Sequence, residues 1–339
     1  MKRFIVRCLA LGVALVTLLA AAFAWYAHEP LGLRTSPLDF TIEPGSTMKQ
    51  VARQLVDAGI DVEPFALVTL ARLTRQANGI KAGSYEVEAG ITPLRLLSKL
   101  TRGDVTQAEM ALIEGWNFRQ FRAALDRHPD LRHDTLGLTD AEILERIGAN
   151  ARHPEGLFYP DTYLFAKRSS DVDLLRRAHQ NLQNVLASEW DRRADGLPYR
   201  NAYQALIMAS IVEKETGKAS ERQIVAGLYS NRLRQGIMLQ ADPTIIYPIT
   251  KGKPLGRRIR QSEIQAVNDY NTYSMIGLPK GPITNPGKAS IAAVLHPAQT
   301  DALYMVADGT GGHQFASTLE QHNVNVEKWY TIRKERGDF

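Results

Sequence analysis

Glu215, about two thirds of the way along the chain, is the side chain best suited by its position to do chemistry. It lies near the end of the segment Asn201–Gly217, which begins with an asparagine cap and ends with a glycine, as helices do. Winding this helix at about 100° per residue places Glu215 in the middle of an apolar arc, whereas Glu213 falls on the polar side with Ser210.

A carboxyl group among apolar side chains is desolvated, which raises its pKa and lets it hold a proton near neutral pH, as a general acid must. The same segment is compatible with a second interpretation, in which Glu215 is a solvated residue beyond the last buried turn of the helix.

Other kinds of reactive centre find no support in the sequence. Ser210 and Lys214 do not have the Ser-x-x-Lys spacing of penicillin-binding enzymes, and neither Gly-x-Ser-x-Gly nor His-Glu-x-x-His occurs. The eight histidines and the single cysteine, Cys8, are not spaced as metal ligands. We therefore expect no metal and no cofactor.

The composition is that of a globular protein of more than one domain. The 339 residues are 44% hydrophobic and 23% charged, with a formal net charge of +5. No block of lysine and arginine is interleaved with aromatic residues, so a nucleic-acid partner is not expected.

The N-terminus has the pattern of a membrane anchor. Basic residues precede a long apolar run that ends in Trp25 and Tyr26, which predicts a cytoplasmic tail over residues 1–7, a transmembrane helix over 8–27 and a linker over 28–37. The alternative is a cleaved signal peptide, because Ala22-Phe-Ala24 has the small-x-small form of a cleavage site. In either case the remaining chain is exported.

The sequence predicts an α+β fold for the exported part. Residues 38–115 predict strands over 38–42 and 83–87 that enclose two helices, which is the layout of a small LysM-like carbohydrate-binding module, followed by connecting elements. Residues 116–339 predict a larger α+β catalytic domain built around the buried, glutamate-bearing helix. Helices are expected over 117–125, 140–147, 172–192 and 220–236, a hairpin over 302–316 and a last helix to about 336.

Two irregular stretches of this domain are candidates for function. Residues 155–165 place several aromatic residues beside two carboxylates, which fits either a loop that closes a core or a cleft wall for sugar rings. Residues 268–287 form a long loop rich in Asn, Tyr, Gly and Pro, and a loop of this length in a compact domain is more often functional than idle.

Six blocks in the second half of the chain resemble those of the YceG-like family of endolytic murein transglycosylases, in the same order. They are Glu213-Lys-Glu-Thr216, Leu239-Gln-Ala-Asp-Pro-Thr244, Tyr270-Asn-Thr-Tyr273, Gly277-Leu-Pro-Lys-Gly-Pro-Ile283, Asn285-Pro-Gly287 and Val306-Ala-Asp-Gly-Thr-Gly-Gly-His313.

The resemblance implies that Glu215 is the catalytic residue. It also implies that the substrate is bound by Thr216, Gln240, Asp242, Asn271, Tyr273 and His313. Lys280 departs from the family, in which proline is common at this position. A cation there would either contact an acidic peptide stem or be solvated.

A lone acid suffices for glycan cleavage when the C6 hydroxyl of N-acetylmuramic acid attacks its own anomeric carbon, which leaves a 1,6-anhydro end. The resemblance implies an enzyme anchored in the inner membrane, with its catalytic domain on the periplasmic side, that limits glycan strand length and works with peptidoglycan synthases. The alternatives are a non-catalytic peptidoglycan-binding scaffold and a hydrolytic muramidase with two catalytic carboxylates.

Overall fold

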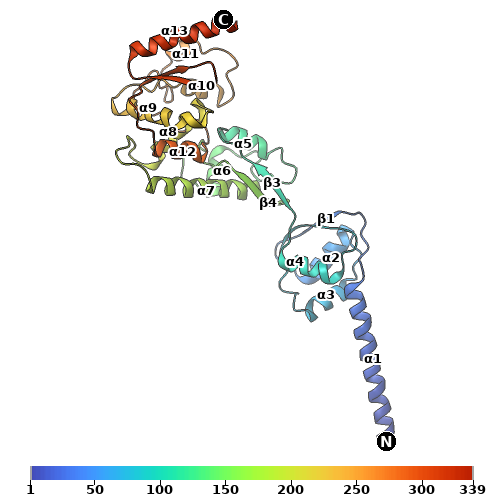
Figure 1. Ribbon diagram of the computed structural model, residues 1–339. Coiled ribbons are helices and arrows are strands. Elements are labelled where there is room, and N and C mark those ends of the chain that lie inside the picture. Colours follow the sequence, from blue (N-terminus) through green and yellow to red (C-terminus); the bar gives the residue numbers. More distant parts are fainter. Residues whose placement is uncertain (1, 338–339) are drawn as a thin grey trace. The chain divides into compact units, whose positions relative to one another are not determined.

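The computed structural model describes residues 2–337 and contains two compact units (Figure 1). Unit 1 comprises residues 1–109, 130–132 and 164–169, and unit 2 comprises residues 110–129, 133–163 and 170–339. Both helices and strands are present, as the predicted α+β class requires. The main boundary between the units falls after Glu109, a few residues before the expected one at 115.

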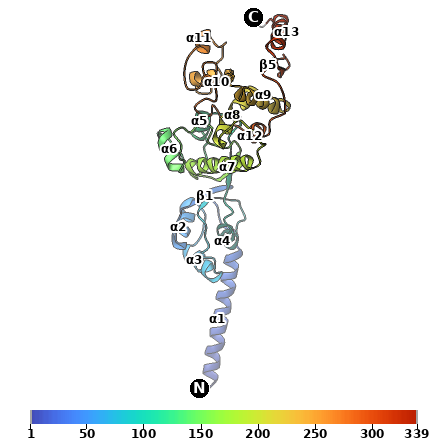
Figure 2. The same cartoon turned by 90° about the vertical axis from the view of Figure 1, so that its left-hand side faces the viewer.

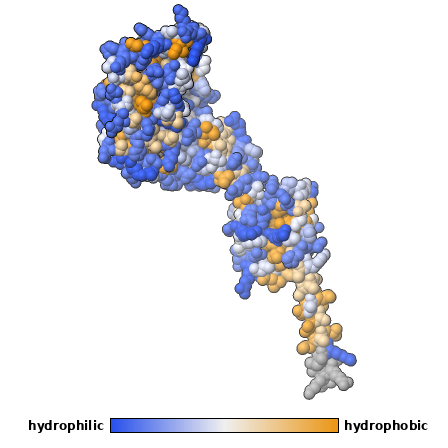
Figure 3. Space-filling view, in the orientation of Figure 1, coloured by the Kyte–Doolittle hydropathy of each residue, from blue (hydrophilic) through white to orange (hydrophobic). Residues whose placement is uncertain are grey.

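Unit 1 begins with helix α1 (Lys2–His28), so residues 2–7 of the expected tail are helical. Residues 9–28 have a mean hydropathy of 2.1, and this is the one helix among residues 2–337 that is long and apolar enough to cross a membrane. Figure 3 shows its apolar side chains along the helix. The expectation of an apolar N-terminal helix of spanning length is confirmed.

The end of α1 packs on the module that follows. Ala27 and Leu31 are buried in its core, and the Leu31 N–H donates to the Ile91 carbonyl at 2.8 Å. Leu33 forms an isolated β-bridge with Ile60. Much of the stretch expected as a linker is therefore packed against the module.

The module consists of β1 (Leu38–Ile42), α2 (Met48–Ala58), α3 (Pro64–Leu73), β2 (Gly83–Val87) and α4 (Pro93–Arg102). The strand–helix–helix–strand order is confirmed. β1 and β2 pair antiparallel with Phe40 opposite Tyr85, and the two rings stack at 5.6 Å. The assignment of this module as LysM-like stays a prediction.

Strands β3 (Gln107–Ala111) and β4 (Thr162–Ala166) pair in a second two-stranded sheet. The stretch 155–165 therefore ends in a strand. Tyr163 and Phe165 are buried whereas Thr162 and Leu164 are exposed, which is the period-two alternation of a strand. Helices α5 (Phe118–Leu125) and α6 (Asp140–Ile147) lie where they were expected.

Unit 2 is organised around helix α8 (Ala202–Glu215), which contacts four other helices (Figures 1 and 2). These are α7 (Asp171–Asp191), α9 (Arg222–Arg234), α10 (Asp242–Thr250) and α12 (Lys288–Leu295). A single 3-10 turn (Ala219–Glu221) precedes α9, and the short α11 spans Gln261–Ile264. Every residue from 205 to 212 is buried, so α8 is a core helix without a polar face.

The C-terminal part is a hairpin of β5 (Tyr304–Ala307) and β6 (His313–Ala316), on which α13 (Leu319–Arg336) packs. The hairpin and the last helix were both predicted. Helices α10 and α12 were not, because each is short and begins at a sequence that reads as a turn, Asp242-Pro and Asn285-Pro-Gly.

Helix α9 approaches the backbone near residue 298 so closely that Gly227 is required there. A Cβ at this position would lie 2.6 Å from the Ala298 carbonyl oxygen and 2.8 Å from Thr300 Cγ2. Alanine would gain about 1 kcal/mol in helix propensity, but overpacking costs about 1–3 kcal/mol. Because the closest contact is with a backbone oxygen, the cost falls toward the upper end of that range, and we expect Gly227→Ala to be less stable by up to about 2 kcal/mol in urea unfolding followed by circular dichroism.

The control for this experiment is Gly217→Ala, because an added Cβ there meets no atom within 4 Å. A Gly227→Ala chain as stable as the control would show that α9 does not rely on this close approach.

Candidate active site

Glu215 is the last residue of α8 and is half-buried. The helix starts at Asn201, whose side chain accepts from the Gln204 N–H at 3.0 Å, and its buried middle fixes the direction in which its end points. The backbone of Thr216 is extended, so the helix stops directly after the glutamate.

The Glu215 carboxyl opens into a cavity of about 350 Å³ within unit 2. The lining comes from the ends of α8 and α10, one face of α9, the loop at 273, the hairpin and α13. It comprises Glu215, Leu228, Tyr229, Arg232, Leu239, Gln240, Asp242, Tyr273, Met305, Val306, Ala307, His313 and Trp329. Four of the six predicted substrate-binding residues are thus brought together with Glu215.

The hydroxyl of Tyr229 donates to Glu215 Oε1 at 2.8 Å, from a side chain that is 1% exposed. Burial raises the pKa of Glu215 from the ordinary 4.5 to about 7; the Tyr229 hydrogen bond opposes this rise, and the nearby charge of Asp242 adds to it. The carboxyl group therefore exchanges its proton near neutral pH.

Asp242 and Tyr273 form a second polar pair in the cavity. The Tyr273 hydroxyl donates to Asp242 Oδ1 at 2.6 Å, and Asp242, the first residue of α10, is exposed. Burial and the charge of Asp242 raise the pKa of Tyr273, so this phenol stays protonated and remains a donor.

Arg232 organises the floor of the cavity from α9. Its guanidinium donates to the carbonyls of Leu303, Met238 and Leu239 at 2.6–3.0 Å and to the side-chain oxygen of Gln240 at 3.2 Å. These contacts hold Gln240, which has a left-handed φ of 53°, at the rim. Arg232 is itself 7% exposed, so the guanidinium is a structural group under the cavity.

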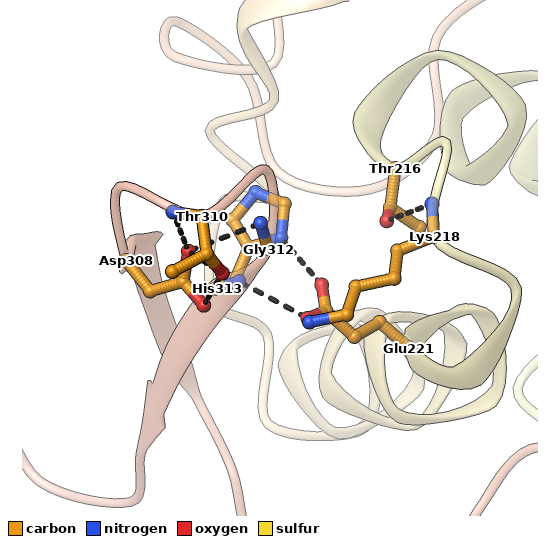
Figure 4. A network of polar contacts seen from close by, with 7 residues as sticks. All are labelled: Thr216, Lys218, Glu221, Asp308, Thr310, Gly312 and His313. Carbon is orange, nitrogen blue, oxygen red and sulfur yellow. Dashed lines mark hydrogen bonds and ion pairs between the residues drawn. The ribbon is translucent and has the colours of Figure 1, made fainter.

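His313 is fixed by a carboxylate from the turn that precedes α9 (Figure 4). Its Nδ1 lies 2.9 Å from Glu221 Oε2, and Lys218 Nζ lies 3.1 Å from Glu221 Oε1. Burial opposes ionisation of Glu221, but the hydrogen bonds from His313 and Lys218 outweigh it and lower its pKa. Because the carboxylate accepts, Nδ1 of His313 carries a proton, and Nε2 is left for the cavity.

The glycine-rich turn between the strands of the hairpin allows this contact. A Cβ on Gly312 would lie 2.2 Å from Glu221 Oε1, so only glycine fits. Asp308 closes the turn by accepting from the N–H groups of Thr310 and Gly312 at 2.7 and 3.1 Å (Figure 4).

Two of the predicted substrate-binding residues lie outside the cavity lining. Asn271 is fully buried, and its amide donates to the carbonyls of Glu263, Ile264 and Ala266 while its oxygen accepts from the Tyr273 N–H. Thr216 is 3% exposed, and its hydroxyl accepts from the Lys218 N–H at 3.0 Å. The structure thus gives Asn271 and Thr216 contacts that position the chain around Glu215 and Tyr273.

Tyr229, Arg232 and Trp329 line the cavity but were not predicted. Tyr229 and Arg232 are three residues apart, which places both on one face of α9. The sequence pattern that could have indicated them is a helix with apolar positions that also carries a tyrosine and an arginine on one face. Trp329 offered none, because it lies on the terminal helix, far from the other residues in sequence.

The polar side predicted for α8 does not exist. Ser210 is fully buried, where it donates to the Ile207 carbonyl at 2.7 Å and accepts from the Ile283 N–H at 3.0 Å. Glu213 accepts from the Gly287 N–H at 3.1 Å and from the Ser290 hydroxyl at 2.6 Å, at the start of α12. The helical wheel was wrong for these two residues because residues 205–212 are buried on every side of α8 and because Glu213 is bonded to the start of α12.

A model of the YceG-like family matches residues 40–328, and the chain belongs to this family. The resemblance seen in the six blocks is thereby confirmed. A protein of Bacillus subtilis named endolytic murein transglycosylase is 29% identical over 277 residues, which are 77% of this chain and 76% of that protein.

A protein of the same name from Streptococcus pneumoniae is 27% identical over 327 residues, which are 84% of this chain and 57% of that protein. The match thus spans just over half the length of the pneumococcal relative. A solved YceG-like protein of Listeria monocytogenes is 25% identical, with a TM-score of 0.52 over 85% of this chain and 98% of that one.

The contacts of Glu213 give a prediction about stability. Glu213→Ala leaves the Gly287 N–H and the Ser290 hydroxyl without their acceptor at a buried helix start, which costs about 1–3 kcal/mol. We expect a lower urea midpoint than that of Lys214→Ala, which changes the exposed neighbour. Equal midpoints for the two variants would contradict this role of Glu213.

Proposed function

We propose that this chain is an endolytic murein transglycosylase that cleaves the bond between N-acetylmuramic acid and N-acetylglucosamine in nascent peptidoglycan. The observation that carries the proposal is the Glu215 carboxyl at the end of a core helix, poised near neutral pH in a cavity lined by hydroxyl, amide, imidazole and aromatic groups. The names of the relatives support the same activity.

In the proposed reaction, protonated Glu215 gives its proton to the oxygen of the leaving sugar as the glycosidic bond breaks. The resulting carboxylate then accepts the proton of the C6 hydroxyl as that oxygen bonds to the anomeric carbon. The products are a 1,6-anhydro end and a new free end, with no water consumed, and Glu215 regains its proton. The Tyr229 hydroxyl stabilises the carboxylate form between the two steps.

The other polar groups of the cavity are suited to hold sugar hydroxyls and acetamido groups. Asp242 offers an acceptor, Gln240 both an acceptor and donors, and His313 its Nε2, whereas Trp329 and Tyr273 offer aromatic faces. In this proposal Asn271 and Thr216 act on the substrate through the residues they position.

The setting of this reaction is part of the proposal. Helix α1 anchors the chain in the inner membrane with its basic N-terminus in the cytoplasm, which leaves the module that follows α1 and unit 2 on the periplasmic side. The module of unit 1 is LysM-like and holds the glycan. Cleavage close to the membrane then limits strand length beside the peptidoglycan synthases.

A hydrolytic muramidase is the second candidate, and a specific observation favours it. Asp242 provides a second carboxylate in the cavity of Glu215, at a position expected to bind substrate rather than to act in catalysis. Cleavage by a pair of carboxylates uses one as acid and the other as base or nucleophile, and adds water to the product.

Substitution of Glu215 tests the reaction. Glu215→Gln keeps the shape of the side chain but removes the proton, so we expect the full-length chain in detergent to release glycan fragments at least about 100-fold more slowly. The control is Glu327→Gln, an exposed glutamate of α13 whose side chain is not hydrogen-bonded in the described part of the chain.

Mass spectrometry of the fragments separates the candidates. Anhydro ends from the wild-type chain support the transglycosylase, whereas reducing ends that carry an added water support the muramidase. Equal release by wild type and Glu215→Gln would contradict both enzymes and leave the scaffold alternative.

A further inference from the structure

A second concave region of unit 2 lies around Glu155 and takes no part in the reaction proposed above. It consists of two cavities of about 530 and 910 Å³ that share His153, Glu155, Tyr270 and Lys280. Sites for small molecules usually measure about 300–1,000 Å³, so this region has room for a short peptide. The segment 155–165 is therefore both core and cleft wall, with Phe158 buried and Glu155 at the cavity.

The charge balance of this region is positive. Five cations and two carboxylates line the two cavities: Arg119, Arg122, Arg152, Lys251, Lys280, Asp140 and Glu155. Arg122 pairs with Asp140 at 3.6 Å, and Lys280 pairs with Asp269 at 3.0 Å. Arg119, Arg152 and Lys251 are exposed and have no ion-pair partner in the part of the chain that the structure describes.

Glu155 forms no ion pair with these cations among the described residues, and its two oxygens are used by neutral donors instead. Oε1 accepts from the Phe118 N–H at 3.0 Å, and Oε2 accepts from the Tyr247 hydroxyl at 3.1 Å. Burial raises the pKa of Glu155 to about 7, against these hydrogen bonds. Its role is to fix Tyr247, whose ring lies 5.0 Å from that of Tyr270.

Asn117 fixes the backbone of the two segments that carry Arg119 and Lys251. Its side-chain oxygen accepts from the Gln120 N–H at 2.8 Å and so caps α5, which carries Arg119. Its NH₂ group donates to the Lys251 carbonyl at 2.7 Å, at the end of α10. Asn117 therefore connects the start of α5 to the end of α10, and this connection shapes the wall of the cavity.

The same two segments line this region and the Glu215 cavity. Helix α10 contributes Asp242 to the Glu215 cavity and Tyr247 to the Glu155 region, and the loop at 270–273 contributes Tyr273 and Tyr270 in the same way. One polymer could therefore contact both: an uncharged sugar chain suits the Glu215 cavity, and branches that carry carboxylates suit the cations of the Glu155 region.

We propose that the Glu155 region binds the acidic peptide branch of peptidoglycan through Arg119, Arg152 and Lys251, while the sugar chain occupies the Glu215 cavity. This inference rests on the proposed function for the identity of the ligand. The three cations come from α5, the loop after α6 and the end of α10, a spread that suits carboxylates spaced along a peptide better than one phosphate group.

Calorimetric titration of the full-length chain in detergent tests the proposal. The probes are a synthetic stem pentapeptide with free carboxylates and the same peptide with every carboxylate amidated. We expect the acidic peptide to bind more tightly, and Arg119→Gln/Arg152→Gln to weaken its binding at least about tenfold, less so at high salt. The matched control, Arg127→Gln/Arg200→Gln, removes the same charge outside the region.

The outcomes separate this site from the reaction. Peptide binding does not require turnover, so the Glu215→Gln chain should bind the acidic peptide as tightly as wild type, even if no anhydro ends are ever formed. Equal binding of the acidic and amidated peptides, or an unchanged affinity in the Arg119/Arg152 double variant, would overturn the proposal. Displacement of the peptide by inorganic phosphate at equal concentration would overturn it in favour of a phosphate site.

Discussion

Partial desolvation of the Glu215 carboxyl, set against the hydroxyl of Tyr229, is the interaction on which the rest of the site depends. Burial raises the pKa of the carboxyl, and the hydrogen bond lowers it, with a net pKa of about 7. The balance requires a tyrosine that is itself buried and cannot ionise, which is the situation of Tyr229. It also requires a helix whose middle, residues 205–212, is fully buried, so that the end of the helix is held at the cavity. A surface helix ending in glutamate would have a solvated carboxylate instead.

The long loop from 268 to 287 owes its order to buried polar groups rather than to regular structure. Asn271 satisfies three carbonyls, and the hydroxyls of Thr272 and Thr244 lie 2.8 Å apart and tie the loop to α10. These bonds spare Asn271, Thr272 and Thr244 the cost of about 1–3 kcal/mol for each buried polar group left unsatisfied. The Thr284 hydroxyl of the same loop is buried without a hydrogen-bond partner among the described residues. Its tyrosines can then be presented on two sides, Tyr273 toward the Glu215 cavity and Tyr270 toward the Glu155 region.

Local pattern predicted most of the helices and strands and the position of Glu215, because capping residues and periodicity act within a few residues. It failed where the answer depends on distant parts of the chain. Ser210 and Glu213 were placed on a polar face, yet each meets a backbone N–H more than seventy residues away. Tyr229 and Arg232 gave only a weak signal, since their partners follow from how α9 packs. The family blocks marked Asn271 and Thr216 as substrate-binding residues, which stays a prediction, but burial, which a single sequence does not reveal, places both outside the cavity lining.

The central claim is that Glu215 holds its proton up to neutral pH, and its direct measure is the pH titration of the Glu215 carboxyl carbon by nuclear magnetic resonance. The signal is assigned by its loss in Glu215→Gln, and Tyr229→Phe serves as the comparison. The account predicts a midpoint near pH 7 in the wild-type chain and a higher one in Tyr229→Phe, because the hydrogen bond that favours the charged form is gone. A midpoint near 4.5, the ordinary value for glutamate, would show a solvated carboxylate and contradict the account.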